Sequence, residues 1–214
     1  VLAERYASPA MRAIWAPESK VIAERRLWIA VMRAQAAAGL DIPNATIADY
    51  EARAGDVDLA SIAGRERVIK HDVKARIEEF NALAGHESIH LGMTSRDLTE
   101  NVEQMQVRQS MELLRDKSVT SLDRLAGLAV AYSETAMVGR SHNVAAQVTT
   151  LGKRFATVAE EMLLGLDRLE ALIDRYPMCG IKGPVGTAQD MLNLFDGDSD
   201  KLAQLESGVA EHLG

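Results

Sequence analysis

The chain of 214 residues contains five prolines, and none of them lies between Pro43 and Pro177. Proline breaks helices and central strands, so this proline-free stretch of 133 residues leaves room for very long helices. Residues 96–126 within it also lack glycine, and strong helix formers such as alanine dominate the composition. Aromatic residues, which favour sheets, make up only 4% of the chain. The sequence therefore predicts an all-α fold.

Start and stop signals delimit the first predicted helices. Pro17 is suited to the first turn of a helix, and Gly39 is placed to end it. A shorter helix is expected to begin near Thr46. A third helix is predicted over residues 68–83, and residues 85–95 form an irregular segment that interrupts the helical pattern.

Two longer amphipathic runs follow. The first begins with Thr94 or Ser95 as its N-cap and continues to about Tyr132, which makes it over ~50 Å long at ~1.5 Å per residue. The second covers residues 148–176, where apolar residues recur by threes and fours. Residues 139–143 form a polar break between the two helices.

Helices of this length cannot bury their apolar faces inside one compact chain of this size. The predicted architecture is therefore a small N-terminal helical domain, residues 1–93, followed by the start of a long-helix bundle, residues 94–214, that is incomplete. Such a bundle needs partner helices, so we expect copies of the chain to associate.

Charge and composition narrow the possible functions. The chain has 24 Lys and Arg against 31 Asp and Glu, a net charge of −7, which argues against a general nucleic-acid binder. A single cysteine, Cys179, fits a reducing compartment. No apolar stretch approaches ~18 residues and no signal-peptide pattern opens the sequence, so we expect a cytoplasmic protein without membrane contact.

One motif suggests a metal site. His86-Glu87-Ser88-Ile89-His90 matches H-E-x-x-H, which on a helix places two imidazoles on one face to bind zinc, with the glutamate as general base. Gly85 and Gly92 flank the motif and disfavour a helix, and no third ligand has a recognisable spacing. A zinc hydrolase that uses His86, Glu87 and His90 is therefore kept as an alternative.

Two further histidines could act in catalysis or serve only structure. His142 lies in the polar break beside Ser141, where it could exchange a proton near neutral pH or cap a helix. His71 lies between Lys70 and Asp72, a pattern that also fits an ordinary solvated helix face. Neither histidine defines a site alone.

The predicted start of the first long helix could bind an anion. Thr94 and Ser95 are helix-capping residues, and the free N–H groups and dipole of a helix N-terminus attract negative charge. The glycine-rich segment 180–186 matches no phosphate-binding fingerprint.

Taken together, five motifs in fixed order carry more information than any one of them. They are Arg5-Tyr6-Ala7-Ser8-Pro9, Lys70-His71-Asp72-Val73, residues 90–97, residues 139–154 and residues 182–187. In this order, and across all 214 residues, they resemble the adenylosuccinate lyase family of the fumarase/aspartase superfamily. The resemblance implies the long-helix bundle fold of that superfamily.

The resemblance also implies an activity. Members of the family release fumarate from adenylosuccinate by β-elimination, which leaves AMP, and they cleave the succinyl-carboxamide ribotide of the purine pathway in the same way. By resemblance His142 is the general acid, Ser141 lines the same pocket, and Arg5 and Tyr6 hold the nucleotide phosphate.

The same resemblance assigns further residues to the substrate site: Lys70, His71, Asp72, His90, Thr94 and Ser95. His71 would assist catalysis by binding phosphate or orienting the acid, and Thr94 and Ser95 would bind a succinyl carboxylate. The resemblance implies no cofactor and no metal, a nucleotide substrate, and a homotetramer in which three subunits build each active site.

The sequence departs from the family pattern in two places. The family's His-x-Gln-Pro-Ala-Gln reads His142-Asn-Val-Ala-Ala-Gln147 here, and the loop Ser-Ser-x-Met-Pro-x-Lys-x-Asn that carries the serine base has no counterpart. The sequence stops about halfway through a family chain, so we expect these 214 residues alone to have little activity. A non-catalytic helical scaffold is the remaining alternative.

Overall fold

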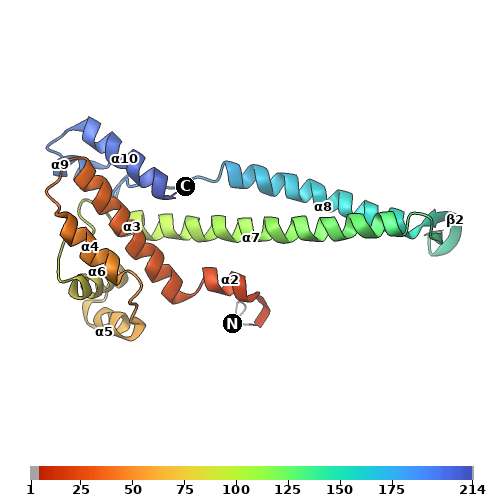
Figure 1. Ribbon diagram of the computed structural model, residues 1–214, viewed down its shortest axis with the longest axis horizontal. Helices are drawn as coiled ribbons and strands as arrows, with labels where there is room; N and C mark the ends of the chain where they lie inside the picture. Colours follow the sequence, from red (N-terminus) through yellow and green to blue (C-terminus); the bar gives the residue numbers. More distant parts are fainter. Residues whose placement is uncertain (1–4, 214) are drawn as a thin grey trace. The chain divides into compact units, whose positions relative to one another are not determined.

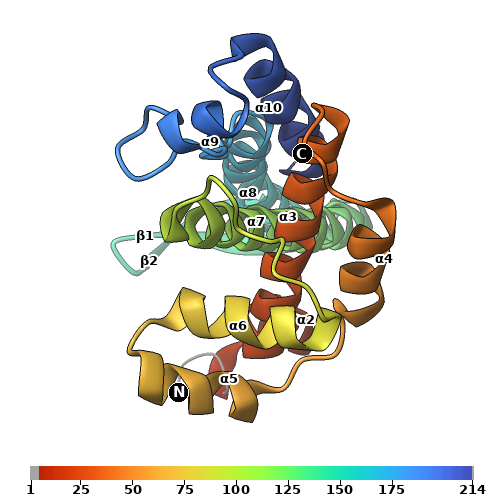
Figure 2. The same ribbon diagram turned by 90° about the vertical axis from the view of Figure 1, so that its left-hand side faces the viewer.

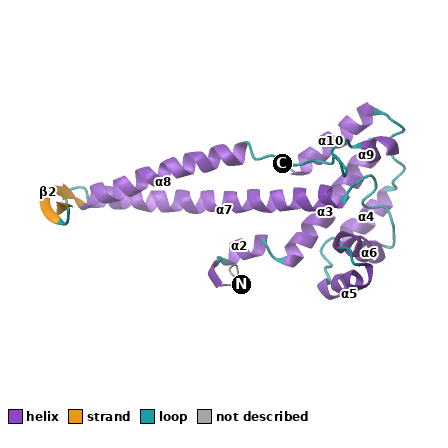
Figure 3. Cartoon of the chain, turned by 180° about the vertical axis from the view of Figure 1, so that it is seen from behind, coloured by secondary structure: helices purple, strands orange, loops and turns teal. Residues whose placement is uncertain are grey.

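The computed structural model of the protein describes residues 5–213. Those residues form helices and one β-hairpin, which confirms the predicted all-α class (Figure 3). The elements in chain order are α2 (Pro9–Ile14), α3 (Pro17–Ala37), α4 (Asn44–Arg53), α5 (Leu59–Ile69), α6 (Asp72–Ala84), α7 (Ser95–Ala131), β1 (Ala136–Ser141), β2 (Val144–Thr150), α8 (Leu151–Asp174), α9 (Gln189–Leu194) and α10 (Ser199–Leu213).

The chain divides into two compact units, and α7 passes from one into the other. Unit 1 comprises Val1–Val107 together with Pro177–Gly214, and unit 2 comprises Arg108–Tyr176. Residues 177–213 thus pack with the N-terminal helices, although they follow the long helices in sequence. The predicted domain boundary between residues 93 and 94 stays a prediction.

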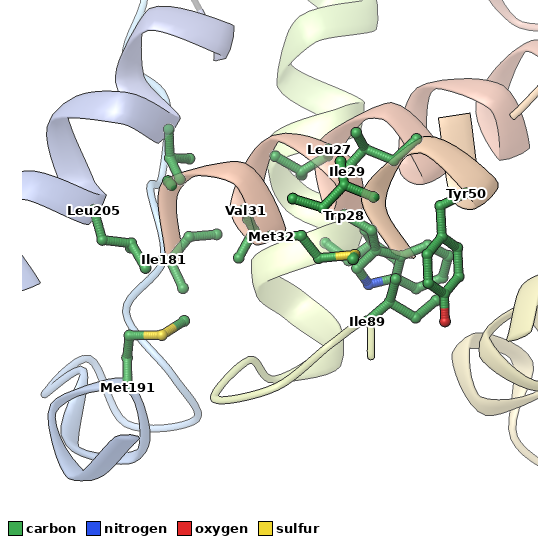
Figure 4. Packing of buried hydrophobic residues seen from close by; sticks show 14 of the residues in the cluster. Leu27, Trp28, Ile29, Val31, Met32, Tyr50, Ile89, Ile181, Met191 and Leu205 are labelled. Carbon is green, nitrogen blue, oxygen red and sulfur yellow. The ribbon is translucent and has the colours of Figure 1, made fainter. Parts of the chain in front are cut away.

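Helix α3 is the centre of unit 1. Helix α10 packs along it (Figure 1), and α4 and α6 lie on another side (Figure 2). Trp28 of α3 is 1% exposed and lies with Tyr50 of α4 and Ile89 in the core, while Met191 and Leu205 come to the same core from the C-terminal segment (Figure 4). The contacts of α3 therefore join the two sequence segments of unit 1.

The predicted helix over residues 68–83 is wrong at its start, while residues 72–83 are helical as predicted. Lys70 adopts the left-handed conformation, with φ 60°, and ends α5, while His71 is the N-cap of α6. A right-handed helix cannot continue through a left-handed residue, so the segment forms two helices joined by a sharp turn. The predicted stop at Gly85 is confirmed, because Gly85 caps α6 with φ 77°.

The polar break between the long helices is a β-hairpin. β1 and β2 pair antiparallel, and His142 and Asn143, with φ of 49° and 64°, form the two-residue turn between them. Positive φ at both turn positions matches the right-handed twist of the strands. Residue Val148, which the sequence placed in the second long helix, lies in β2, and that helix begins at Leu151.

Two charged side chains of α3 are buried in unit 1. Arg25 pairs with Glu79 at 2.5 Å, donates to the carbonyl of Arg53 at 2.9 Å and lies over the Phe80 ring at 4.6 Å. Glu24 is fully buried and accepts a hydrogen bond from Arg76 at 3.1 Å. Burial raises the pKa of Glu24 to about 7, although the charge of Arg76 opposes the rise.

Among the described residues, none of the helices combines the length and the apolar character that crossing a membrane requires.

The joint between α7 and α8 depends on a glycine. The N–H of Gly152 donates to the carbonyl of Tyr132 at 2.9 Å, and a Cβ at position 152 would lie 2.7 Å from the backbone nitrogen of Ser133. We expect Gly152→Ala to lower the free energy of unfolding by about 1–3 kcal/mol. Gly165 lies on the exposed face of α8, and a Cβ there would have no atom within 4 Å. Gly165→Ala should therefore raise the free energy of unfolding by about 0.4–1 kcal/mol. Urea denaturation of both variants checks this, and equal effects would contradict it.

The buried carboxyl of Glu24 predicts a pH dependence of stability. Its pKa is about 7 in the folded chain against 4.5 ordinarily, so between these values the folded chain holds a proton that the unfolded chain has lost. The free energy of unfolding therefore falls as pH rises from about 4.5 to about 7, by about 3 kcal/mol. Glu24→Gln should abolish this fall.

Urea denaturation at pH 5 and pH 8 measures the effect of Glu24. Glu18→Gln, at an exposed position of the same helix, is the matched control and should keep the pH dependence of the unmodified chain. The same pH dependence in Glu24→Gln as in the unmodified chain would contradict the prediction.

Candidate functional site

The turn between α5 and α6 carries three of the predicted site residues. His71 caps α6 through its side chain, because its Nδ1 accepts from the N–H of Lys74 at 3.2 Å. Lys70, His71 and Asp72 are all exposed. The turn therefore presents a cation, an imidazole and a carboxylate side by side on the surface of unit 1.

Arg76 connects this turn to the buried core. Its guanidinium donates to the carboxylate of Asp72 and, at 3.1 Å, to Oε1 of the buried Glu24. Asp72 is one turn before Arg76 on α6, so the pair also follows the favourable i, i+4 spacing. The exposed turn is thus joined through Arg76 to the buried Glu24 carboxyl of α3.

His90 lies in the loop before α7 and is hydrogen-bonded to a residue of the buried core. It adopts φ 66°, and its Nδ1 accepts a hydrogen bond from the indole N–H of Trp28 at 3.0 Å. Burial lowers the pKa of His90 to about 4; Asp97 opposes this shift, and His71 and Lys74 add to it. His90 is therefore neutral at pH 7, and it lies within electrostatic reach of the His71 turn.

The geometry needed for the zinc alternative is missing from this loop. His86 and His90 do not share a helix face, since the segment between α6 and α7 is irregular. His86 Nε2 contacts Asp49 at 2.8 Å, and Nδ1 of His90 is engaged by Trp28. Among residues 5–213, no group of three or more His, Cys, Asp and Glu side chains is placed to share a metal ion.

The N-terminus of α7 is capped by its own aspartate. The N–H of Thr94 donates to Oδ2 of Asp97 at 2.9 Å, and the N–H of Asp97 donates back to the carbonyl of Thr94 at 3.1 Å. Thr94 and Ser95 are both half-buried. A substrate carboxylate at this helix end would therefore meet the hydroxyl groups of Thr94 and Ser95 rather than the N–H of Thr94.

A stripe of three polar side chains on α7, two buried and one half-buried, was not identified from the sequence. Asp97 also accepts from the N–H groups of Lys182 at 2.9 Å and Gly183 at 3.1 Å. Asn101 exchanges hydrogen bonds with the backbone of Gly180, and Gln104 accepts from the N–H of Cys179 at 2.9 Å. We call this the α7 polar stripe, which comprises Asp97, Asn101 and Gln104.

The spacing of the α7 polar stripe is the signal that could have revealed it. Its members are four and three residues apart, so they share one helix face, immediately beside the apolar residues Leu98 and Val102, which are fully buried. Polar side chains at such positions are expected to satisfy backbone groups of another segment. That segment is the motif at residues 182–187 and the residues just before it.

Unit 2 holds Ser141 and His142, both exposed at the hairpin end. Arg140 donates to the carbonyl of Asn143 at 3.0 Å, which closes the turn that carries His142. Beside the hairpin is an open groove of about 800 Å³. The basic residues that line it are Arg140, Lys153 and Arg154. The groove is therefore suited to an anionic ligand.

Arg5 and Tyr6 precede α2 and are exposed. The Arg5 guanidinium lies over the Tyr6 ring at 5.5 Å, and Tyr6 is 72% exposed. Unit 1 thus contains eight of the predicted site residues, and His90 lies within electrostatic reach of both His71 in the α5–α6 turn and Asp97 at the start of α7. The roles of all ten residues stay predictions.

The sequence also matches a family of known proteins. The family, described as Lyase, matches residues 5–207, the greater part of the chain. The chain belongs to this lyase family.

Named relatives sharpen the assignment. The chain is 33% identical to the adenylosuccinate lyase of Schistosoma mansoni, 32% identical to that of Saccharomyces cerevisiae and 34% identical to that of Methanocaldococcus jannaschii. These alignments cover 98–100% of the chain and 45% of each relative. The chain thus spans about half the length of these relatives, and the predicted resemblance to adenylosuccinate lyases is confirmed.

Solved structures confirm the fold. The chain superposes on the 3-carboxy-cis,cis-muconate lactonizing enzyme of Pseudomonas putida with a TM-score of 0.85 and 23% identity, over 100% of this chain and 49% of that one. The fumarate lyase of Mesorhizobium sp. BNC1 gives 0.80 and 24%, over 94% and 47%. The long-helix bundle fold of the fumarase/aspartase type is therefore confirmed.

Asp97 offers a test of the α7 polar stripe. Asp97→Asn keeps the shape of the side chain but turns one acceptor oxygen into a donor that faces backbone N–H groups. We expect the free energy of unfolding to fall by about 1–3 kcal/mol and the amides of Lys182 and Gly183 to exchange faster with solvent. Hydrogen exchange measured by NMR checks this.

The exposed Asp123→Asn on the same helix is the control and should change stability by less than about 0.5 kcal/mol. Unchanged exchange of the Lys182 and Gly183 amides in Asp97→Asn would show that the stripe does not hold this loop.

Proposed function

We propose that this chain is the N-terminal half of an adenylosuccinate lyase, which releases fumarate from adenylosuccinate to leave AMP and from the succinyl-carboxamide ribotide in the same way. The observation that carries the proposal is the alignment of the whole chain with adenylosuccinate lyases from an animal, a fungus and an archaeon at 32–34% identity. The five sequence motifs all lie within that alignment.

The reaction needs a base for the Cβ proton, stabilisation of the resulting anion and an acid for the departing nitrogen. We assign the acid to His142, whose place at the tip of an ordered hairpin turn leaves its imidazole exposed to a substrate. We place Ser141, the residue before His142, beside the acid in the substrate site. A nearby groove is lined by Arg140, Lys153 and Arg154 rather than by His142, and its positive charge supports the assignment, because the substrate is polyanionic.

Unit 1 supplies the groups that bind substrate. Arg5 and Tyr6 hold the phosphate, and Thr94 and Ser95 bind a succinyl carboxylate with their hydroxyl groups. Lys70, His71, Asp72 and His90 line the site. The electrostatic influence of His71 on His90 supports a single constellation for the last group.

The base must come from outside these residues. The family's serine-base loop has no counterpart in this sequence, which contains no Ser-Ser pair and no Met-Pro pair. The 214 residues alone should therefore turn over little adenylosuccinate, and activity requires a polypeptide that also carries the second half of the family fold.

Assembly is part of the proposal. In unit 2 the buried large apolar residues are few, and exposed ones lie along α7, the hairpin and α8. They include Val130, Val138, Val148, Val158, Leu163 and Leu164. We infer that further helices, from the second half and from other copies, cover these side chains in a cytoplasmic homotetramer that shares its active sites between subunits.

His142→Ala in the full-length protein tests the proposed acid. We expect turnover of adenylosuccinate, followed by its ultraviolet absorbance, to fall by about 100- to 10,000-fold, because a positioned general acid contributes that much. His86→Ala, which removes a histidine paired with Asp49, should leave turnover unchanged. Unchanged turnover in His142→Ala would remove this residue from the role.

A non-catalytic helical scaffold, the alternative reading of the sequence, predicts a different result in the unmodified protein. A scaffold would show no fumarate release in the unmodified protein, and neither AMP nor adenylosuccinate would shift its melting temperature.

A further inference from the structure

The hydrogen bond between Trp28 and His90 joins the core of unit 1 to the loop before α7. Trp28 is 1% exposed on α3, and its Nε1 lies 3.0 Å from Nδ1 of His90. The two rings meet edge to face, with centroids 5.9 Å apart and planes at 83°. His90 itself is half-buried.

The chemistry of the indole decides which nitrogen of His90 carries the proton. An indole N–H can only donate, so the nitrogen that receives it must have a free lone pair. In neutral imidazole one nitrogen donates and the other accepts, so the proton of His90 is on Nε2. An imidazolium would direct its Nδ1–H against the indole N–H, so the contact opposes protonation.

The surroundings hold both rings in this arrangement. Trp28 stacks on Phe80 with centroids 6.3 Å apart, and Ile89, next to His90, is 4% exposed in the same core cluster (Figure 4). The carbonyl of Leu91 accepts a hydrogen bond from Gln35 of α3 at 2.9 Å. The loop on both sides of His90 is therefore tied to the core.

The charges around His90 do not reverse the preference for the neutral imidazole. Asp97 favours the charged imidazole, while His71 and Lys74, on the neighbouring turn and helix, disfavour it. Burial is the largest influence, and the pKa of His90 is lowered to about 4.

We propose that Trp28 is a positioning residue that keeps His90 as the neutral Nε2–H tautomer, so that His90 gives a hydrogen bond to an anionic oxygen of the substrate and does not act as a proton-donating acid. A neutral donor of this kind keeps its proton across the pH range in which an ordinary histidine gains and loses its charge. The part that concerns substrate rests on the proposed function.

Ring ¹⁵N NMR of the histidine-labelled chain tests the tautomer directly and needs no substrate. His90→Gln identifies the His90 signals. From pH 5.5 to 8 we expect Nδ1 of His90 at the shift of an unprotonated nitrogen and Nε2 at that of a protonated one. A protonated Nδ1, or a ring that becomes charged within this range, would overturn the proposal whether or not the Trp28 variant folds.

Trp28→Phe keeps an aromatic ring but removes the indole donor. We expect the His90 signals to move toward a mixture of tautomers, whereas Trp15→Phe, at a position 44% exposed, should leave them in place. Unchanged His90 signals in a folded Trp28→Phe chain would show that Trp28 does not select the tautomer.

The kinetic consequence is measured in the full-length protein. Trp28→Phe should raise KM for adenylosuccinate about tenfold and change kcat by less than about threefold, since one hydrogen bond to a charged group is weakened. A fall in kcat with unchanged KM would overturn the donor role. Absence of turnover in the unmodified protein would instead overturn the proposed function and leave the NMR result standing.

Discussion

Unit 1 depends on hydrogen bonds between the α7 polar stripe and the backbone of residues 179–183. Each of its three side chains accepts from backbone N–H groups about 80 positions later in the sequence. Such bonds are worth about 1 kcal/mol each when made, and cost more when a buried group is left without a partner. These bonds attach residues 179–183 to the N-terminal part of unit 1, although the whole of unit 2 lies between the two segments in the sequence.

The attachment of residues 179–183 places α9 and α10 against the rest of unit 1. Helix α9 then packs against the loop before α7. Gly92 has φ 68°, and a Cβ there would lie 2.8 Å from Leu194 Cδ1 of α9. The same loop is bound on its other side by Trp28 and Gln35 of α3. The loop that carries His90, Thr94 and Ser95 is therefore built from segments at both ends of the sequence.

The long helices could be predicted from sequence because local rules decide them. Pro17 and Gly39 mark the limits of α3, and the absence of glycine and proline after residue 95 predicts α7. The left-handed Lys70 and the His142–Asn143 turn lack the usual glycine at positive φ, so the split of α5 from α6 and the hairpin were missed.

The candidate site, like the fold, could be predicted only where local sequence patterns decide it. The five motifs identified the family and named the residues of the α5–α6 turn and of the loop before α7. The bond from Trp28 to His90 joins residues 62 positions apart, and the contacts of Asp97 with Lys182 join residues 85 apart. No local pattern predicts such pairs, because tertiary packing decides them.

The central claim is that a protein with this N-terminal half eliminates fumarate from a succinylated purine nucleotide or its ribotide precursor. The most direct measurement is proton NMR of the full-length protein incubated with adenylosuccinate alone. The account predicts that the vinyl signal of fumarate appears in step with AMP, one molecule of each per substrate consumed. Intact adenylosuccinate, or its loss without fumarate, would contradict the account.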